Sequence, residues 1–301
     1  MTAAATAPKG ASEFSTQPRI DMVRFKADGD TTMIDALHFL PEVPTERAMI
    51  LIPGLNGSIM GAGRHDYRPM ANALAEAGFA FLLPQLRALD NFPYAVFEDV
   101  VKDIGGVVAF AKAQGYREIA LFGTSLGGPR IALWFARRGD PAIRAAGFIA
   151  SIISPYDEFQ IRQPEGERRR LDQVLADARR HVAEGRPLTP VAFENWFPGR
   201  HMMMAAHSFL GFFGTGSECE AVSVRHAPAI RVPTLVLHGT AEEISLGPNA
   251  EAIHASLVNA PSRDLVWVEG AKHYLTPGWI ADAFARETAG WLARTLPAQA
   301  R

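Results

Sequence analysis

A serine in the middle of the chain has a glycine two positions before it and another two positions after it, in the segment Gly-Thr-Ser-Leu-Gly at residues 123–127. An apolar run at residues 118–122 precedes it, and a stretch with helical spacing at residues 125–138 follows it. In a tight strand-to-helix turn, a side chain two positions before or after the serine would collide with its neighbours, so both positions need glycine. The turn pushes the Ser125 hydroxyl out at the carboxyl edge of a sheet, where the helix N-terminus favours negative charge. The spacing therefore predicts Ser125 as a nucleophile.

The rest of the sequence supplies the strands and helices that such a turn needs. Short continuous apolar runs are typical of strands buried on both faces of a parallel sheet, and they occur at residues 48–53, 79–83, 118–122, 146–153, 234–237 and 264–268. Stretches with helical spacing alternate with them at residues 67–77, 96–114, 125–138, 249–257 and 279–296. Two further stretches, residues 21–26 and 33–40, are expected to pair as strands. The alternation predicts an α/β fold: a mostly parallel, doubly wound sheet of about eight strands with helices on both faces.

One segment breaks the alternation. Between residues 157 and 232 no strand is predicted, and the segment contains a basic helix around residues 167–183 and a stretch rich in Phe, Trp and Met at residues 191–213. Its size predicts a helical cap inserted into a core formed by residues 19–156 and 233–301. The apolar stretch either packs the cap onto the core or lines an acyl or aromatic pocket. Residues 1–18 are small and polar without the apolar centre of a secretory signal, so we expect a disordered tail.

Four motifs make the sequence similar to the α/β-hydrolase superfamily, in its serine esterase and lipase-like branch with a helical cap. They are Gly-Thr-Ser-Leu-Gly at residues 123–127, Pro-Gly-Leu-Asn-Gly at 53–57, His-Gly-Thr-Ala-Glu at 238–242 and Gly-Ala-Lys-His at 270–273. The resemblance extends from about residue 21 to about residue 296. It implies the α/β-hydrolase fold and a triad in the chain order serine, acid, histidine, which this sequence keeps.

The resemblance also implies which residues complete the triad. A serine hydroxyl needs a base near neutral pH, and the family supplies it from the loop after the last strand, where this chain has His273. The acid keeps the imidazole in the right tautomer and stabilises its cation. The family usually places an Asp just after the His-Gly that ends the seventh strand, and this chain has Glu242 at that position. Asp157, after the sixth strand, is the alternative acid, because some relatives take the acid from there.

Acyl transfer also needs hydrogen-bond donors for the oxygen that becomes negative in the tetrahedral intermediate. One expected donor is the backbone N–H of Leu126, directly after the nucleophile. The resemblance implies a second donor from the loop after the third strand, where alignment places the N–H of Leu55. The glycines of that loop also suggest phosphate binding, but the loop lacks the Lys and Ser/Thr that complete a P-loop.

The composition limits the partners and cofactors. With 30 Lys and Arg against 32 Asp and Glu, the formal charge is -2, which gives no basic surface for nucleic acid and no polybasic membrane anchor. No apolar run is long enough for a transmembrane span. No Cys/His cluster, P-loop or dinucleotide fingerprint accompanies the triad, so neither a metal nor an organic cofactor is predicted. The single cysteine, Cys219, excludes an intrachain disulfide and fits the cytoplasm, the expected location. A homo-oligomer stays open.

The predicted activity is hydrolysis of a carboxylic ester, a lactone or a thioester of a moderately hydrophobic small molecule through an acyl-enzyme. Related dehalogenases and epoxide hydrolases have Asp where this chain has Ser125, which disfavours both activities. Amide hydrolysis and carbon–carbon hydrolysis of a dienoic diketone use the same triad and stay open. A ligand-sensing protein with this fold is the alternative from another class, and the complete set of serine, acid and histidine favours an enzyme.

Overall fold

The apolar runs of the sequence form the strands of one sheet in the computed structural model, which describes residues 16–55, 67–194, 201–273 and 282–298. The eight strands lie in the order β1-β2-β4-β3-β5-β6-β9-β10. Strand β2 pairs antiparallel with β1 and β4, and the other neighbours are parallel. The predicted α/β fold with a mostly parallel sheet is confirmed. The bounds are β1 (Arg19–Lys26), β2 (Met33–Leu40), β3 (Arg47–Ile52), β4 (Ala80–Gln85), β5 (Glu118–Thr124), β6 (Ile143–Ile149), β9 (Thr234–Gly239) and β10 (Arg263–Val268).

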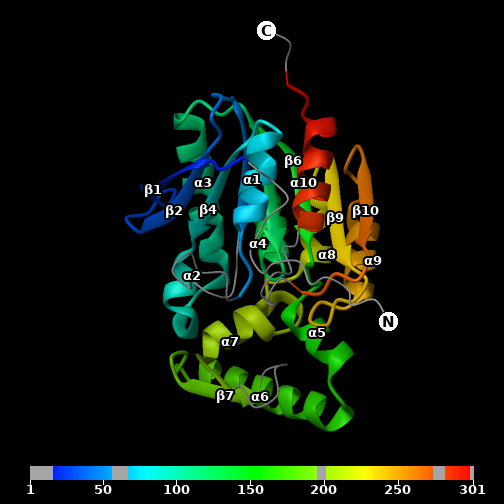
Figure 1. The fold of residues 1–301 in the computed structure, drawn as a ribbon. Coiled ribbons are helices and arrows are strands. Elements are labelled where there is room, and N and C mark those ends of the chain that lie inside the picture. Colours follow the sequence, from blue (N-terminus) through cyan, green and yellow to red (C-terminus); the bar gives the residue numbers. More distant parts are fainter. Residues whose placement is uncertain (1–15, 56–66, 195–200, 274–281, 299–301) are drawn as a thin grey trace, which may run out of the picture.

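Helices cover both faces of the sheet (Figure 1). On one face, α1 (Arg68–Glu76) and α10 (Asp282–Thr295) contribute to one apolar layer. On the other face, α3 (Val100–Ala113), α4 (Gly127–Arg137) and α9 (Gly247–Ser256) contribute to a second. The central strands are buried along almost their whole length because both of their faces meet helices. This burial explains why they are continuous apolar runs rather than alternating ones.

The parallel strands end together at one edge of the sheet. The register aligns their last residues: Ile52 with Gly123, Thr124 with Ile149, Ile149 with Leu237, and Gly239 with Val268. The loops that follow β3, β5, β9 and β10 therefore meet at this edge. These loops carry the residues singled out in the sequence, namely Leu55, Ser125, Glu242 and His273.

Most of the chain between β6 and β9 forms a separate group of elements beyond the carboxyl edge, in the lower part of Figure 1. They are α5 (Pro155–Arg162), α6 (Glu165–Ala183), β7 (Pro190–Glu194), β8 (His201–Ala205) and α7 (Ala206–Phe213). The last helix before β9, α8 (Ser223–His226), packs against α4 and α9 of the core instead. The prediction that no strand lies in this insertion is wrong, because β7 and β8 form an antiparallel pair. Along β7, Val191 and Phe193 are buried and Ala192 is exposed, which is the two-residue period of a strand. That the insertion acts as a cap over the site stays a prediction.

Aromatic side chains pack the insertion onto the core. Phe212 on α7 lies edge-on to Phe92 and Phe97 of the core, with ring centroids 4.9 Å and 5.1 Å apart. Phe209 and Phe213, also on α7, stack at 5.2 Å and are buried. Such pairs stabilise beyond the area that they bury. Most of the described apolar residues of this stretch therefore serve packing, whereas Trp196 and Phe197 lie outside the described residues.

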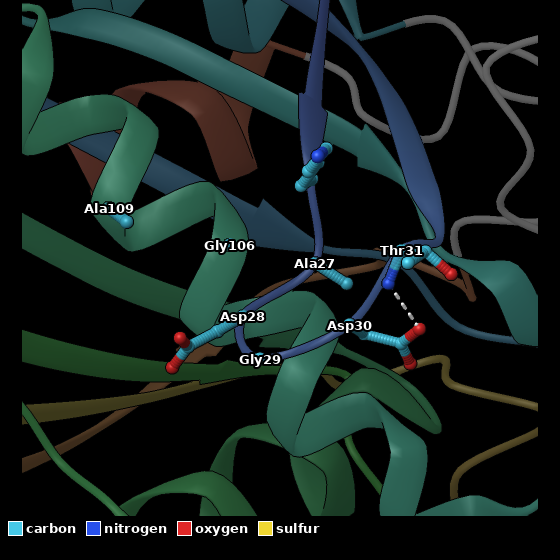
Figure 2. A pocket seen from close by; sticks show the side chains of 8 residues that line it. Ala27, Asp28, Gly29, Asp30, Thr31, Gly106 and Ala109 are labelled. Atoms are coloured by element: carbon cyan, nitrogen blue, oxygen red, sulfur yellow. Dashed lines mark hydrogen bonds between the residues drawn. The ribbon is translucent and has the colours of Figure 1, made fainter.

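Helix α3 passes close to the turn between β1 and β2, as Figure 2 shows. Gly106 and Ala109 on this helix line an open hollow together with residues 26–31 of the turn. A β-carbon on Gly106 would lie 2.5 Å from the carbonyl oxygen of Lys26, which belongs to the backbone and cannot rotate away. Glycine therefore sets how closely this helix approaches the sheet.

We expect Gly106→Ala to lower the free energy of unfolding by about 1–3 kcal/mol, because the added methyl group forces the backbones apart. Gly166→Ala on α6 is the matched control, since nothing lies within 4 Å of a β-carbon there. Its higher helix propensity should raise the stability by about 0.5 kcal/mol. Urea unfolding of both variants measures this difference. Equal effects of the two substitutions would contradict the close approach of α3.

Candidate active site

Ser125 lies in the turn between β5 and α4 with its backbone in a strained conformation. Its φ is 51°, in the left-handed region that residues other than glycine rarely adopt. A β-carbon on Gly123 would overlap the carbonyl group of Gly127, and one on Gly127 would overlap the carbonyl oxygen of Ile52. Both glycines are therefore required by backbone-to-backbone contact. The Ser125 N–H donates to the carbonyl oxygen of Ile149 at 3.0 Å and holds the turn against β6.

Ser151 supports the same turn from the loop after β6. Its buried hydroxyl donates to the carbonyl oxygen of Ser125 at 2.9 Å. The N–H of Gly128 donates to the same oxygen at 3.0 Å. A β-carbon on Gly128 would overlap the Ser151 hydroxyl, so the two residues are packed without a gap. Ser151 was not among the predicted site residues, because a serine after a strand has no distinguishing motif.

A buried imidazole–carboxylate pair follows β9 and β10. Nδ1 of His273 lies 2.9 Å from the carboxylate of Glu242, and both side chains are only 1% exposed. Oε1 of Glu242 also accepts the N–H of Ile244 at 2.7 Å and of Ser245 at 3.1 Å. Burial disfavours the charged carboxylate, but the hydrogen bond and charge of His273 and the two N–H groups outweigh it, so the pKa of Glu242 is lowered. The pair is suited to an ionised acid that orients an imidazole.

The alternative acid has a different set of contacts. Asp157 lies in the first turn of α5, where its carboxylate accepts the Ser154 hydroxyl at 2.6 Å. The Asp157 N–H donates back to the Ser154 oxygen at 3.0 Å, which is the arrangement of a helix N-cap. The structure therefore brings Glu242 to His273 and gives Asp157 contacts that start a helix.

The serine turn and the acid loop are connected through Ser151. The Ser245 hydroxyl donates to the Ser151 carbonyl oxygen, while the Ser245 N–H binds Glu242. The Ser151 hydroxyl in turn binds the backbone of Ser125. The strands β5, β6, β9 and β10 are neighbours in this order in the sheet. Together with the bond between Glu242 and His273, these bonds link the loop after each of these strands to the loop after the next. Ser125, Glu242 and His273 are thus held at one edge of the sheet.

A buried arginine connects the two segments that carry the expected oxyanion donors. Leu126 is the N-cap residue of α4 and is buried, and Leu55 follows β3 and is half-buried. Nη1 of Arg130, on the second turn of α4, donates to the carbonyl oxygen of Pro53 at 2.7 Å and of Gly54 at 3.3 Å. Arg130 is 1% exposed, so these charged hydrogen bonds are formed away from water. They fasten the loop that leads to Leu55 onto the helix that begins after Leu126.

Further observations concern metal ligands, the cysteine and the helices of the residues that the structure describes. No three of His, Cys, Asp and Glu come together there as ligands of a metal ion. Burial raises the pKa of the Cys219 thiol to about 12, which disfavours a nucleophilic thiolate. In the same residues no helix combines the length and the apolar character of a membrane span.

Solved structures with this architecture include several esterases. The esterase domain of a Rhodothermus marinus protein is 18% identical, with a TM-score of 0.61 over 92% of this chain and 98% of that chain. Est1E from Butyrivibrio proteoclasticus is 17% identical, with a TM-score of 0.62 over 92% and 99%. The esterase PF2001 of Pyrococcus furiosus is 14% identical, with a TM-score of 0.60 over 93% and 92%. At these identities the similarity establishes the fold alone.

The sequence itself also matches a family. No curated protein matches the chain. The model of the alpha/beta hydrolase family matches residues 49–287, which include the serine turn, the acid loop and the histidine loop. The match spans most of the chain and agrees with the strand order and with the glycine-bounded turn at Ser125. The chain therefore belongs to the alpha/beta hydrolase family.

Proposed function

We propose that this protein is a serine hydrolase that cleaves a carboxylic ester of a small, moderately hydrophobic molecule. The observation that carries the proposal is the combination of Ser125 at φ 51° with a buried His273–Glu242 pair, 2.9 Å apart, at the same sheet edge. The left-handed conformation of Ser125 costs conformational energy, and such strained residues cluster at functional sites. A buried imidazole bonded to a carboxylate is the usual device for activating a hydroxyl.

The proposed reaction uses each residue in one role. The Ser125 hydroxyl attacks the ester carbonyl while His273 takes its proton, and the lowered pKa of Glu242 keeps a negative charge beside the imidazolium. The N–H groups of Leu126 and Leu55 bind the oxyanion. His273 then gives the proton to the leaving alcohol. In the second half of the reaction a water molecule attacks the acyl-enzyme while His273 takes its proton. His273 then returns this proton to Ser125 as the carboxylic acid leaves.

The charge of the protein supports an uncharged substrate. The clustered arginines of α6 form ion pairs with neighbouring glutamates on the same helix, Arg169 with Glu165 and Arg170 with Glu167, and their side chains are exposed. They therefore lie on a solvated face. The near-neutral formal charge of -2 gives no steering field for an acidic or basic substrate.

We expect Ser125→Ala to lower kcat for ester hydrolysis by at least about 10⁴-fold, because members of a triad act as a unit. The wild-type protein should hydrolyse nitrophenyl esters of graded chain length, and a fluorophosphonate probe should label Ser125. Thermal unfolding of the variant controls for folding. Activity that survives the substitution, or labelling at another residue, rejects the proposed nucleophile. If nitrophenyl amides or dienoic diketones turn over faster than every ester, the bond assignment changes.

Three carboxylate variants test which residue is the acid. Glu242→Gln keeps the shape of the side chain but removes its charge and favours the wrong imidazole tautomer, so kcat should fall by roughly 10²–10⁴-fold. Asp157→Asn should cost much less, because the contacts of Asp157 are with Ser154, the N-cap residue of α5. Glu243→Gln should have little effect, since its half-exposed carboxylate pairs with Lys272 at 3.4 Å. The measurement is kcat of the three variants at a pH above the acidic limb. If kcat falls strongly in Asp157→Asn and stays near the wild-type value in Glu242→Gln, Asp157 is the acid.

A further inference from the structure

A buried polar cluster lies beside the loop of Glu242 and has no part in the proposed proton transfers. It consists of Glu158 and Arg162 on α5 and Asn249 on α9. Nε of Arg162 donates to Oε1 of Glu158 at 2.7 Å, and Nδ2 of Asn249 donates to Oε2 at 2.6 Å. Glu158 and Asn249 are both 0% exposed. Each oxygen of the fully buried Glu158 carboxylate thus accepts a hydrogen bond from a side chain that also donates to another group.

These other groups belong to the acid loop. Nε of Arg162 also donates to the carbonyl oxygen of Ile244, and Nδ2 of Asn249 to that of Leu246, both at 2.9 Å. The carbonyl of Ile244 and the N–H of Ser245 belong to one peptide group, which is planar and rigid. A bond that fixes this carbonyl therefore also aims the N–H of Ser245, which donates to Oε1 of Glu242 at 3.1 Å.

We infer that Glu158, Arg162 and Asn249 are positioning residues that orient the loop of Glu242 and thereby the hydrogen bond from Glu242 to His273. The inference rests on the proposed role of Glu242 as the acid. Glu158 is the central residue, because its two oxygens fix both donors that reach the loop. Without the Glu158 carboxylate, Arg162 and Asn249 keep their N–H groups but lose the acceptor that orients their side chains toward the loop.

Stability alone does not account for the cluster. Burial raises the pKa of Glu158 in spite of the bonds from Arg162 and Asn249, and the negative charge of Glu242 raises it further. A buried ion pair of this kind adds little net stability compared with apolar side chains of the same size. What apolar residues cannot supply is direction: two donors aimed at two named carbonyl groups of the acid loop.

The test is Glu158→Gln, assayed on nitrophenyl esters. A glutamine offers one oxygen and one NH₂ group, so one of the two donors now faces another donor. We expect kcat to fall by about 10-fold or more per active site, with KM within about twofold, because a small misplacement of catalytic groups costs rate rather than binding. Fluorophosphonate titration of Ser125 counts the active sites and removes any effect of misfolded protein.

Asp103→Asn is the matched control for loss of a buried carboxylate. Asp103 on α3 is 1% exposed and accepts Nε of Arg87 at 2.6 Å, and its contacts are with α2 (Arg87–Asp90) rather than with the acid loop. This variant should lose thermal stability while its kcat per active site stays within about twofold of wild type. If both variants lose the same fraction of kcat, the cluster has only a structural role and the inference is overturned.

The pH profile supplies a readout that a structural role does not move. Glu158→Gln removes a negative charge near the pair, leaves Arg162 positive and loosens Glu242, and all three changes disfavour the imidazolium. The acidic limb of kcat/KM should therefore move to lower pH, in the same direction as in Glu242→Gln. NMR titration of the His273 imidazole, assigned by its loss in His273→Ala, should show the same shift without any substrate. An unchanged titration in Glu158→Gln overturns the inference.

The second pair of variants is Arg162→Lys and Arg162→Gln. Arg162 is 17% exposed at its side chain, so both should fold. A lysine ammonium can still donate to Glu158 and to the carbonyl of Ile244, and should retain kcat within about threefold, whereas the glutamine should match Glu158→Gln. Equal kcat for the two variants contradicts the inference. If wild type neither cleaves esters nor reacts with the probe, the proposed function fails, and the NMR titration still tests the positioning.

Discussion

The close approach of α4 to the ends of β3 and β5 is the constraint on which the rest of the site depends. It is possible only because Gly123 and Gly127 present bare backbone to each other and to Ile52. The approach forces Ser125 into a left-handed conformation, sets Leu126 at the start of the helix and brings Arg130 against the carbonyls of the β3 loop. One steric condition thus fixes the turn of Ser125 and connects the two segments that carry the expected oxyanion donors. The strands β9 and β10 bring the loops of Glu242 and His273 to the same edge of the sheet.

The loop after β9 carries Glu242 at the position where the resemblance to the family implies the shorter aspartate. This loop bends around the side chain, so that the N–H groups of Ile244 and Ser245 bind Oε1 while the carboxylate faces Nδ1 of His273. The longer side chain is thereby wrapped by its own loop. A loop that must curve in this way needs its carbonyl groups fixed from outside, which is the task that we assign to Arg162 and Asn249.

The sequence predicted those features that depend on local pattern. Continuous apolar runs located β3, β4, β5 and β9, which are buried along almost their whole length because helices cover both faces of the sheet. The run at β10 was located as well, although this edge strand is mostly half-buried or exposed. The glycines around Ser125 located the turn, since the steric reason for them acts within five residues. The strands β7 and β8 were missed because each is five residues long and lies in a segment dominated by helices and large apolar side chains. The Glu158 cluster was missed for a different reason: Glu158 and Asn249 are 91 residues apart, and only the folded sheet brings them together.

The buried carboxylates of Glu242 and Glu158 affect stability in opposite senses. The pKa of Glu242 is lowered, because its bonds to His273 and the loop outweigh burial, so its ionised form stabilises the fold above the unfolded-state pKa. That contribution is lost as the pH falls through the lower, folded-state value. The pKa of Glu158 is raised by burial, so stability decreases as the pH rises from the unfolded-state value toward the folded-state value. Near neutral pH the fold therefore keeps one carboxylate that strengthens it and one that weakens it. The function that we assign to Glu158 explains why a destabilising carboxylate is present there. Its hydrogen-bond donors, Arg162 and Asn249, are the same groups that hold the loop of Glu242.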